Sequence, residues 1–140
     1  MKIIGVNGFG RIGRYFTRMT LESPTVDVAV VNDLADINTL AHLFKYDSVH
    51  GRLKERFNIE GNKIVFENGK VILFISERDP EKIPWKELGV EIVLEATGIF
   101  RTEELAKKHL VGGAKKVVLS APPKEGDVRT VVLGVNEDLL

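Results

Sequence analysis

Three glycines near the start of the chain have a spacing that could let a phosphate group approach the backbone. They are Gly8, Gly10 and Gly13 in the stretch NGFGRIGR, a G-x-G-x-x-G pattern. In a dinucleotide-binding turn, the first glycine allows a tight turn, the second admits the pyrophosphate, and the third lets a helix pack closely on a strand. Each glycine could instead serve only a turn that needs a positive φ angle. The spacing alone leaves both interpretations open.

The segments that flank the glycines favour the dinucleotide interpretation. Residues 2–7, KIIGVN, are typical of a short buried strand, and residues 11–23, RIGRYFTRMTLES, are typical of a helix. The apolar side chains at helical spacing in the second segment are Ile12, Tyr15, Phe16 and Met19. The glycines are therefore expected at a strand-to-helix turn, where the helix N-terminus offers free N–H groups and a partial positive charge to an anion.

An acidic residue at the end of the next apolar run indicates which dinucleotide is bound. Asp33 lies 20 residues after Gly13, about where a dinucleotide-binding domain places the acid that accepts hydrogen bonds from the adenosine ribose. Its charge would repel a 2′-phosphate, and the neighbouring Leu34 and Ala35 offer no arginine to bind one. We therefore expect NAD rather than NADP. The alternative is that Asp33 only caps a helix that starts near Asp36.

Small or polar residues also follow two later apolar runs. VEIVLEATG ends in Thr97 and Gly98, and Phe100 follows two residues later. A glycine there would let the backbone approach a nucleotide, and Phe100 could either cover an adenine or belong to the core. In KVVLSAPP, the hydroxyl of Ser120 comes directly after the apolar residues, and the rigid Pro122 follows two residues later. Ligands of open parallel sheets lie beyond the carboxyl ends of the strands, so these residues are expected to share one edge.

Apolar runs and helical patterns alternate along the chain and predict the elements that position these residues. The valine-rich runs at 26–33, 90–98, 116–123 and 129–136 are continuously apolar, as is typical of buried strands in a parallel sheet. Helical patterns occupy two intervening segments. They are residues 36–47 and residues 102–113, the latter with Thr102 as N-cap and Gly112 and Gly113 at its end.

The stretch 55–79 has a different pattern, because apolar and polar residues alternate in it. Its EGNK and ENGK turns predict small antiparallel strands. The chain contains no repeat and no linker rich in Pro, Gly or Ser. The sequence therefore predicts one α/β domain over residues 1–140, a doubly wound, Rossmann-type, mostly parallel sheet with a small antiparallel hairpin insertion.

The composition argues against several kinds of partner and location. The 20 basic residues balance the 20 acidic ones, so no overall charge favours nucleic acid or an anionic membrane. No segment is long and apolar enough to span a bilayer, and the first residues do not have the pattern of a signal peptide. We therefore expect a cytoplasmic protein with neither nucleic acid nor membrane as partner.

The residues that could carry thiol or metal chemistry are missing or wrongly spaced. The chain has no cysteine, which excludes disulfides, thiolate zinc sites and thiol catalysis by these residues. His42, His50 and His109 lack metal-ligand spacing and a companion nucleophile. We interpret His42 as a helix residue and His109 as a favourable charge near a helix end. We therefore expect neither a metal site nor a catalytic residue in this chain.

Seven phrases along the chain carry a family resemblance. They are GVNGFGRIGR (5–14), VND (31–33), LFKYDSVHG (43–51), ERDPEKIPW (77–85), EATGIF (95–100), GAKKVVLSAP (113–122) and LGVN (133–136). In this order they resemble the N-terminal, NAD-binding half of the glyceraldehyde-3-phosphate dehydrogenase family, and the resemblance covers essentially the whole chain. Their order makes the resemblance far more specific than the glycine pattern. In the family, YDSVHG belongs to a region of subunit and cofactor contacts, which implies a homotetramer.

The resemblance implies a role at the cofactor for each candidate residue. Arg11 and Ile12 would lie against the pyrophosphate and the nicotinamide side, and Ser120 would lie near the nicotinamide. Asp33 would hold the adenosine ribose. Arg78, which on its own would be interpreted as a solvated charge, would lie near the adenine end. The residues that would line the adenine pocket are Thr97, Gly98 and Phe100.

The resemblance also implies what this chain does not contain. Members of the family oxidise glyceraldehyde 3-phosphate through a cysteine thiolate, whose thiohemiacetal passes hydride to NAD before phosphate releases the acyl group as 1,3-bisphosphoglycerate. The chain ends at LGVNEDLL, before the point where the family places that cysteine. We therefore expect a cofactor domain without its catalytic domain, which binds NAD but does not turn over an aldehyde.

Three alternatives stay open on the sequence alone. The nearest is the sister enzyme, erythrose-4-phosphate dehydrogenase, although ERDPEKIPW and VND favour the glycolytic family. The second is a non-catalytic nucleotide-sensing module, which would bind NAD in isolation. The third is a structural or interaction domain with a vestigial glycine turn, in which Asp33 and Ser120 would be coincidences.

Overall fold

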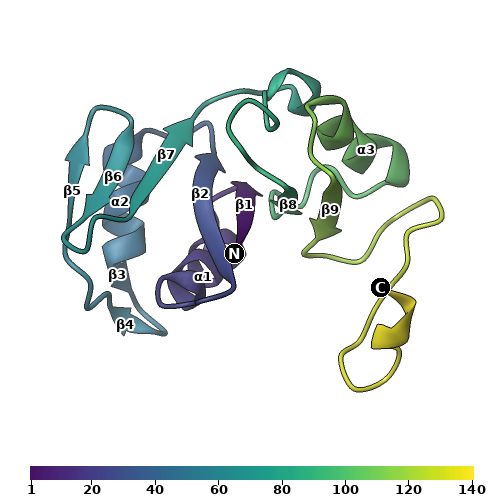
Figure 1. The fold of residues 1–140 in the computed structure, drawn as a ribbon, viewed down its shortest axis with the longest axis horizontal. Coiled ribbons are helices and arrows are strands. Elements are labelled where there is room, and N and C mark those ends of the chain that lie inside the picture. Colours follow the sequence, from purple (N-terminus) through teal and green to yellow (C-terminus); the bar gives the residue numbers. More distant parts are fainter.

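A seven-stranded sheet, in the order β5-β6-β7-β2-β1-β8-β9, forms the centre of the protein (Figure 1). The computed structural model describes all 140 residues. Neighbouring strands are parallel from β7 to β9. The bounds of these strands are β1 Lys2–Asn7, β2 Val26–Asn32, β7 Val71–Ile75, β8 Ile92–Glu95 and β9 Lys116–Leu119. The predicted α/β fold with a mostly parallel sheet is confirmed.

The predicted antiparallel insertion extends this sheet. Strands β5 (Phe57–Glu60) and β6 (Lys63–Phe66) pair antiparallel, and β6 pairs antiparallel with β7. Gly61 and Gly69, in the predicted EGNK and ENGK turns, have positive φ angles. Because β7 is parallel to β2, the insertion continues the main sheet. A separate two-stranded sheet of β3 (Tyr46–Asp47) and β4 (Gly51–Arg52), which we did not predict, follows the second helix.

Side chains cap two of the three helices, and the predicted N-cap Thr102 is one of these side chains. The helices are α1 Arg11–Thr20, α2 Ile37–Lys45 and α3 Glu103–Val111, with short 3₁₀ helices at Pro80–Lys82 and Glu137–Leu139. Asp36 accepts hydrogen bonds from the first turn of α2, and Thr102 does the same for α3, which satisfies N–H groups that the helices leave free. None of the helices combines the length and apolar character needed to cross a bilayer.

The core is divided between the two faces of the sheet, as a doubly wound fold requires. Neighbouring residues of one strand point into different clusters: Val31 and Leu94 pack with Phe44 of α2, whereas Val30 and Val93 belong to a second cluster around Trp85. Side chains alternate across a strand, so both faces must be covered. This explains why the parallel strands are continuously apolar.

Helix α1 is confirmed, but most of its apolar side chains point outward. Ile12 and Met19 are each 56% exposed, whereas Gly13, Thr17 and Thr20 are buried. The small residues are needed on the inner face because α1 lies close against the glycine turn. The hydroxyls of Thr17 and Thr20 donate to carbonyls one turn earlier in the helix, so their burial leaves no donor unsatisfied.

The predicted strand at 129–136 is wrong. These residues form no strand, and Val132, Leu133 and Val135 are exposed. The segment extends away from the edge strand β9 (Figure 1) and is held by local bonds, in which the Asn136 side chain contacts the backbone of Val132 and Thr130. An apolar run becomes a strand only where a neighbour satisfies its backbone, and no neighbour lies beside this one.

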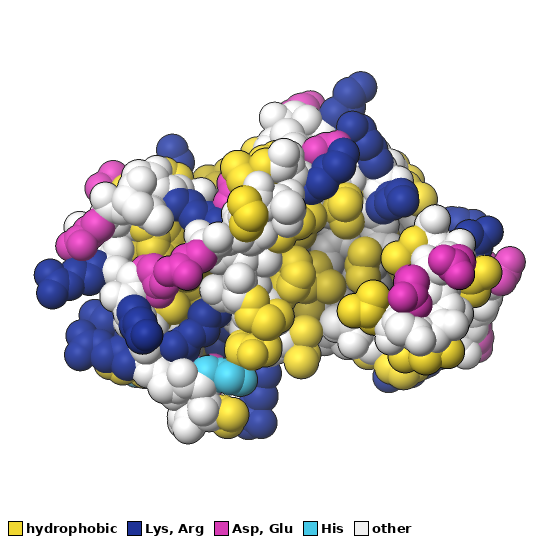
Figure 2. Space-filling view, turned by 60° about the horizontal axis from the view of Figure 1, so that its bottom comes forward, with side chains coloured by type: hydrophobic (Ala, Val, Ile, Leu, Met, Phe, Trp, Pro, Cys, Tyr) yellow, Lys and Arg dark blue, Asp and Glu magenta, His cyan; other side chains and the backbone are white.

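Exposed apolar side chains are concentrated on part of the surface. Figure 2 shows them gathered in the middle of one face, with charged side chains around them. The exposed large apolar side chains of the chain include Ile12 and Met19 of α1, Val49 between β3 and β4, and Leu133 and Leu140 of the C-terminal segment. Contiguous apolar surface of this kind is typical of a face that contacts another domain or subunit.

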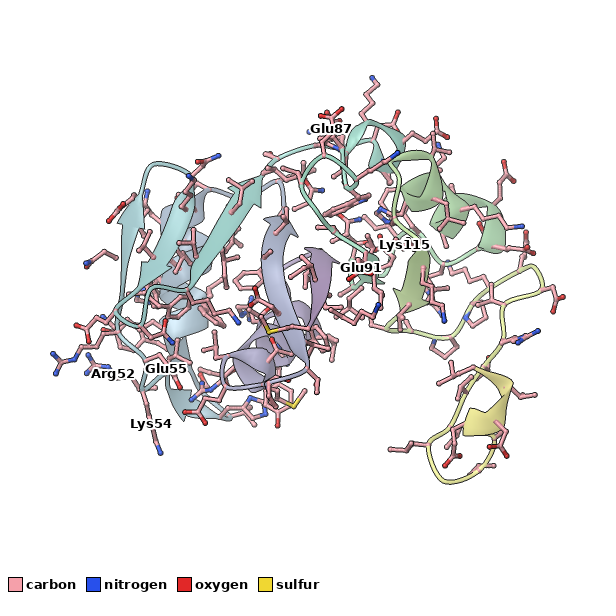
Figure 3. All side chains as sticks on the ribbon, in the orientation of Figure 1. Arg52, Lys54, Glu55, Glu87, Glu91 and Lys115 are labelled. Atoms are coloured by element: carbon pink, nitrogen blue, oxygen red, sulfur yellow. The ribbon has the colours of Figure 1, made fainter.

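A surface ion-pair cluster connects the beginnings of three neighbouring strands. Glu91, just before β8, accepts hydrogen bonds from Lys115, just before β9, and from Lys2 at the start of β1 (Figure 3). The bonds from Lys115 and Lys2 hold the pKa of Glu91 below its ordinary value. Exposed pairs of this kind contribute little to stability, so we assign the cluster no role in the site.

The loop between β3 and β4 predicts a measurable dependence of stability on pH. The Asp47 carboxylate accepts from the backbone N–H groups of His50 and Val49, both at 2.8 Å, and these bonds lower its pKa from 3.8 to about 2. A depressed folded-state pKa adds stability above the unfolded pKa, and that stability is lost as the pH falls through the folded pKa. Asp47→Asn should therefore lower the melting temperature at pH 6, and the difference should shrink between pH 4 and pH 2.

Thermal unfolding of both proteins from pH 2 to pH 6 measures this effect. Asp138→Asn is the matched control, because the Asp138 side chain is exposed and takes part in no hydrogen bond or ion pair. A difference between Asp47→Asn and the parent that is the same at every pH would contradict the assignment.

Candidate dinucleotide-binding site

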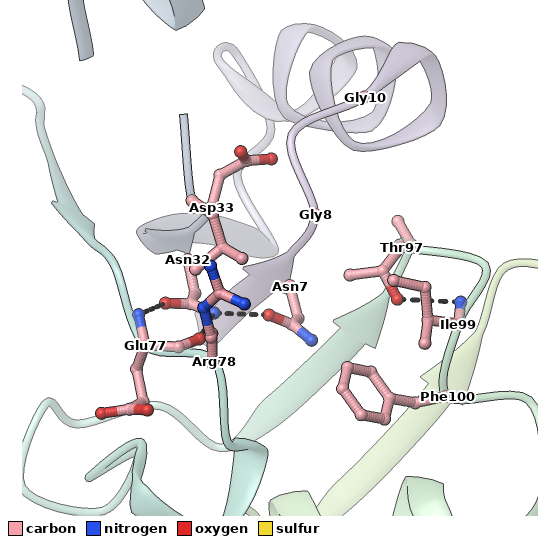
Figure 4. A pocket seen from close by; sticks show the side chains of 12 residues that line it. Asn7, Gly8, Gly10, Asn32, Asp33, Glu77, Arg78, Thr97, Ile99 and Phe100 are labelled. Atoms are coloured by element: carbon pink, nitrogen blue, oxygen red, sulfur yellow. Dashed lines mark hydrogen bonds between the residues drawn. The ribbon is translucent and has the colours of Figure 1, made fainter. Parts of the chain in front are cut away.

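A cavity of about 540 Å³ lies at the carboxyl ends of β1, β2, β7 and β8 (Figure 4). This is the edge at which open α/β sheets bind their ligands. Its residues come from the glycine turn, from the end of β2, from the segment after β7 and from the segment after β8. They are Asn7, Gly8, Gly10, Asn32, Asp33, Leu34, Glu77, Arg78, Ala96, Thr97, Ile99 and Phe100.

Steric contacts exclude a side chain at two of the three glycines, Gly8 and Gly13. Gly8 has a φ angle of +94°, and a Cβ there would lie 2.8 Å from the backbone nitrogen of Thr97. A Cβ on Gly13 would lie 2.1 Å from the carbonyl oxygen of Gly8, which confirms the close helix packing predicted for the third glycine. Gly10 faces open space and is the N-cap of α1, without a side-chain hydrogen bond. The turn thus leaves backbone exposed to the cavity at the helix N-terminus, where an anion is favoured.

Asp33 is held beside this turn by two backbone bonds. One carboxylate oxygen accepts from the N–H of Phe9 at 2.8 Å, and the other accepts from the N–H of Ala35 at 2.9 Å. Asp36, not Asp33, caps α2, so the capping alternative is wrong. Each carboxylate oxygen has more than one acceptor position, which leaves capacity for two ribose hydroxyls.

The remaining walls bring an arginine and an aromatic ring to the cavity. Arg78 follows β7 and lines the side next to Asn32, while Thr97 and Phe100 follow β8 and line the other side (Figure 4). Phe100 is half-buried rather than a core residue. A flat ligand between these walls would meet a cation on one side and an aromatic face on the other.

Four of the predicted residues do not line this cavity. Arg11 and Ile12 are exposed in the first turn of α1, and Gly98 is exposed between two lining residues. Ser120 follows the edge strand β9 and lines a separate cavity of about 310 Å³. The predicted contacts of these four residues with a cofactor stay predictions.

Several lining residues were not among the predicted site residues, and the buried asparagines are the most informative of them. Asn32 donates to the Asn7 side chain at 2.7 Å and pairs with the backbone N–H and carbonyl of Glu77 at 2.8 and 2.9 Å. These bonds form the floor of the cavity. A usable signal was present in the sequence, since both asparagines end a continuously apolar run and so mark the sheet edge.

His109 lies in the last turn of α3, as predicted, but its main contacts are with other elements. Its side chain is completely buried and bonds to Glu95 and Trp85. The helical pattern could not show this, because both partners are distant in sequence. The structure contains no group of three or more His, Cys, Asp or Glu side chains arranged to hold a metal ion.

Comparison with known proteins identifies the origin of this arrangement. The family model described as the NAD binding domain of glyceraldehyde 3-phosphate dehydrogenase matches residues 2–103. The chain belongs to the glyceraldehyde-3-phosphate dehydrogenase family. It is therefore related to oxidoreductases, and NAD, the cofactor predicted from Asp33 and the glycine turn, is confirmed by the matched domain.

Relatives within the glyceraldehyde-3-phosphate dehydrogenase family cover nearly all of this chain. The enzyme of Geobacillus stearothermophilus is 56% identical over 96% of it, and glyceraldehyde-3-phosphate dehydrogenase 1 of Bacillus subtilis is 55% identical over 96%. The enzyme of Thermotoga maritima is 49% identical over 100%. The chain spans only 40 to 42% of the length of these relatives.

Proposed function

We propose that this chain is the cofactor-binding domain of a phosphorylating, NAD-dependent glyceraldehyde-3-phosphate dehydrogenase. One observation carries the proposal: the open glycine turn and the Asp33 carboxylate lie side by side in the wall of one cavity. The hydrogen bond from the backbone N–H of Phe9 to Asp33 joins them. In this arrangement, the backbone at Gly8 and Gly10 receives the pyrophosphate and Asp33 accepts from the adenosine ribose hydroxyls.

The other predicted residues extend this placement along the cofactor. Arg78 lies beside the adenine, opposite Thr97, Gly98 and Phe100. Arg11 and Ile12 follow the pyrophosphate towards the nicotinamide, and Ser120 lies nearest the nicotinamide. The two walls of the cavity support the adenine end of this placement, whereas the nicotinamide end rests on the family resemblance.

The reaction of the complete enzyme needs groups that this chain does not supply. NAD accepts a hydride when bound, and the oxidation of glyceraldehyde 3-phosphate to 1,3-bisphosphoglycerate also needs a nucleophile activated by a base. The chain has no cysteine. We therefore assign residues 1–140 to binding and orienting NAD, and the covalent steps and substrate selection to a catalytic domain outside them.

Assembly is part of the same proposal. The apolar face in Figure 2 supports contact with a catalytic domain and with other subunits, and we propose a cytoplasmic homotetramer as the complete form. The even balance of acidic and basic residues supports a small-molecule cofactor, rather than nucleic acid or a membrane, as the partner of this domain.

Calorimetric titration of the 140-residue chain with NAD and, separately, with NADP tests the proposal. We expect saturable binding at one site per chain, at least roughly tenfold tighter for NAD, because Asp33 repels the 2′-phosphate of NADP. The same sample should show no aldehyde oxidation. Absence of binding by a chain that is folded by circular dichroism would refute the assignment of the cavity.

A further inference from the structure

A row of buried polar side chains runs behind the cavity, along the carboxyl ends of the strands. It connects Asn32, Asn7, Glu95, His109 and Trp85, which are all at most 4% exposed. Successive members are joined by hydrogen bonds of 2.7 Å (Asn32 to Asn7), 2.6 Å (Asn7 to Glu95), 2.7 Å (His109 to Glu95) and 3.0 Å (Trp85 to His109). Glu95, His109 and Trp85 do not line the cavity.

The direction of these bonds follows from the chemistry of the indole ring. An indole N–H can only donate, so Nδ1 of His109 must accept the hydrogen of Trp85. The ring proton of His109 therefore lies on Nε2, which donates to Glu95. On the other side, the Asn7 side chain also donates to Glu95. The hydrogen bonds between members of the row therefore run from both ends toward the Glu95 carboxylate, which accepts from Asn7 and from His109.

The second oxygen of that carboxylate holds the wall of the cavity. It accepts from the backbone N–H of Thr97 at 2.9 Å and from the Thr97 hydroxyl. The hydroxyl oxygen in turn accepts from the N–H of Ile99 at 3.1 Å. Glu95 thus fixes Asn7 in the floor with one oxygen and Thr97 in the wall with the other, although it does not itself face the cavity.

We propose that Glu95 is a positioning residue for NAD, which acts through Asn7 and Thr97, and that His109 fixes the Glu95 carboxylate in this orientation. The proposal rests on the proposed NAD site. A glutamine at position 95 would turn an NH₂ group toward donors on one side, so either the floor or the wall would lose its acceptor. A buried donor without an acceptor forces rearrangement, and a site that must be held to within about 0.5 Å loses affinity as a result.

Glu95→Gln is expected to raise the dissociation constant for NAD by roughly tenfold, in line with the cost of one buried hydrogen bond. The measurement is calorimetric titration of the folded variant. Thr20→Val is the matched control. Thr20 is buried and donates to the carbonyl of Thr17, away from the cavity, so this variant loses a buried hydrogen bond but should bind NAD as the parent does.

Two substitutions of His109 separate positioning from simple packing. His109→Gln can still donate to Glu95 and accept from Trp85, and should bind NAD within about threefold of the parent. His109→Leu fills a similar volume without either bond, and should weaken binding about as much as Glu95→Gln. If the row served only to pack the core, these two variants would bind NAD equally.

Trp85 supplies a spectroscopic signature, because it is the only tryptophan in the chain. Its indole N–H gives a single resonance in a ¹H–¹⁵N spectrum. We expect this resonance to move when NAD saturates the parent, and to move upfield without NAD in His109→Leu, where the acceptor is gone. An indole resonance unchanged by His109→Leu would overturn the assigned bond direction.

The outcomes distinguish this proposal from the function on which it rests. If the parent binds NAD and Glu95→Gln binds it equally, only the positioning role fails. If the folded parent does not bind NAD, the proposed function fails and the positioning role fails with it. If Glu95→Gln does not fold, equal affinities of the two His109 variants would still overturn the proposal.

Discussion

Replacing Asp33 with alanine should weaken NAD binding by roughly ten- to a hundredfold, since hydrogen bonds to charged groups contribute about 1.5–3 kcal/mol. The same change should narrow the gap between NAD and NADP, because the charge that repels the 2′-phosphate is removed. Titration of parent and variant with both cofactors measures the two effects together. The physical basis is the placement of Asp33, whose carboxylate is fixed by Phe9 and Ala35 beside the open turn.

The neighbouring acid Asp36 provides a matched control for this prediction. Asp36 caps α2 and does not line the cofactor cavity, so Asp36→Ala removes a carboxylate only three residues away. Loss of the cap should cost about 1 kcal/mol of stability and leave the ratio of NAD to NADP affinity unchanged. If Asp33→Ala bound NAD and NADP each with the same affinity as the parent does, the role of Asp33 at the ribose would be excluded.

Gly13→Ala should destabilise the domain by about 1–3 kcal/mol, the usual cost of overpacking a tight contact. Alanine is the better helix former by about 1 kcal/mol, so helix propensity alone predicts the opposite sign. The steric effect dominates because the new Cβ would lie 2.1 Å from the carbonyl oxygen of Gly8. Urea unfolding measures the change in the free energy of unfolding, and NAD titration should show weaker binding because the turn must move.

Gly10→Ala, in contrast, should weaken NAD binding with only a small change in the stability of the domain. Gly10 has a φ angle of −73° and open space beside it, so alanine fits without strain. Because Gly10 is the N-cap of α1, where alanine is disfavoured, the free energy of unfolding should fall by no more than about 1 kcal/mol. A Cβ there would nevertheless lie where the pyrophosphate approaches, so NAD affinity should fall.

If Gly13→Ala were as stable as the parent, the close contact between α1 and the turn would not exist in solution.

The parts of the site that could be predicted from the sequence are those coded by neighbouring residues. The glycine turn, the cap at Thr102 and the position of Asp33 after β2 all depend on a few residues of local pattern. The buried row could not be predicted in this way. The Asn7 side chain donates to Glu95, which lies 88 residues away in the sequence. The hydrophobic pattern of α3 gives no sign that His109 faces a carboxylate.

The two errors in the fold also have physical causes. An apolar pattern does not specify which face of α1 is buried when the contact requires small residues such as Gly13 and Thr17. Likewise, the apolar run at 129–136 has the composition of a strand, but the local pattern cannot supply the neighbouring strand that its backbone needs. In both cases, tertiary contacts override the local preference.

The central position of β1 has a consequence for the order in which the domain forms during synthesis. β1 is made before both of its partners, since it pairs on one side with β2 and on the other with β8. A nascent chain therefore carries an open, apolar strand edge until residue 95 has been made, and contacts so distant in sequence form slowly. Gly8 packs against Thr97 only when β8 is in place, so the glycine turn for NAD is synthesised well before the segment that completes it.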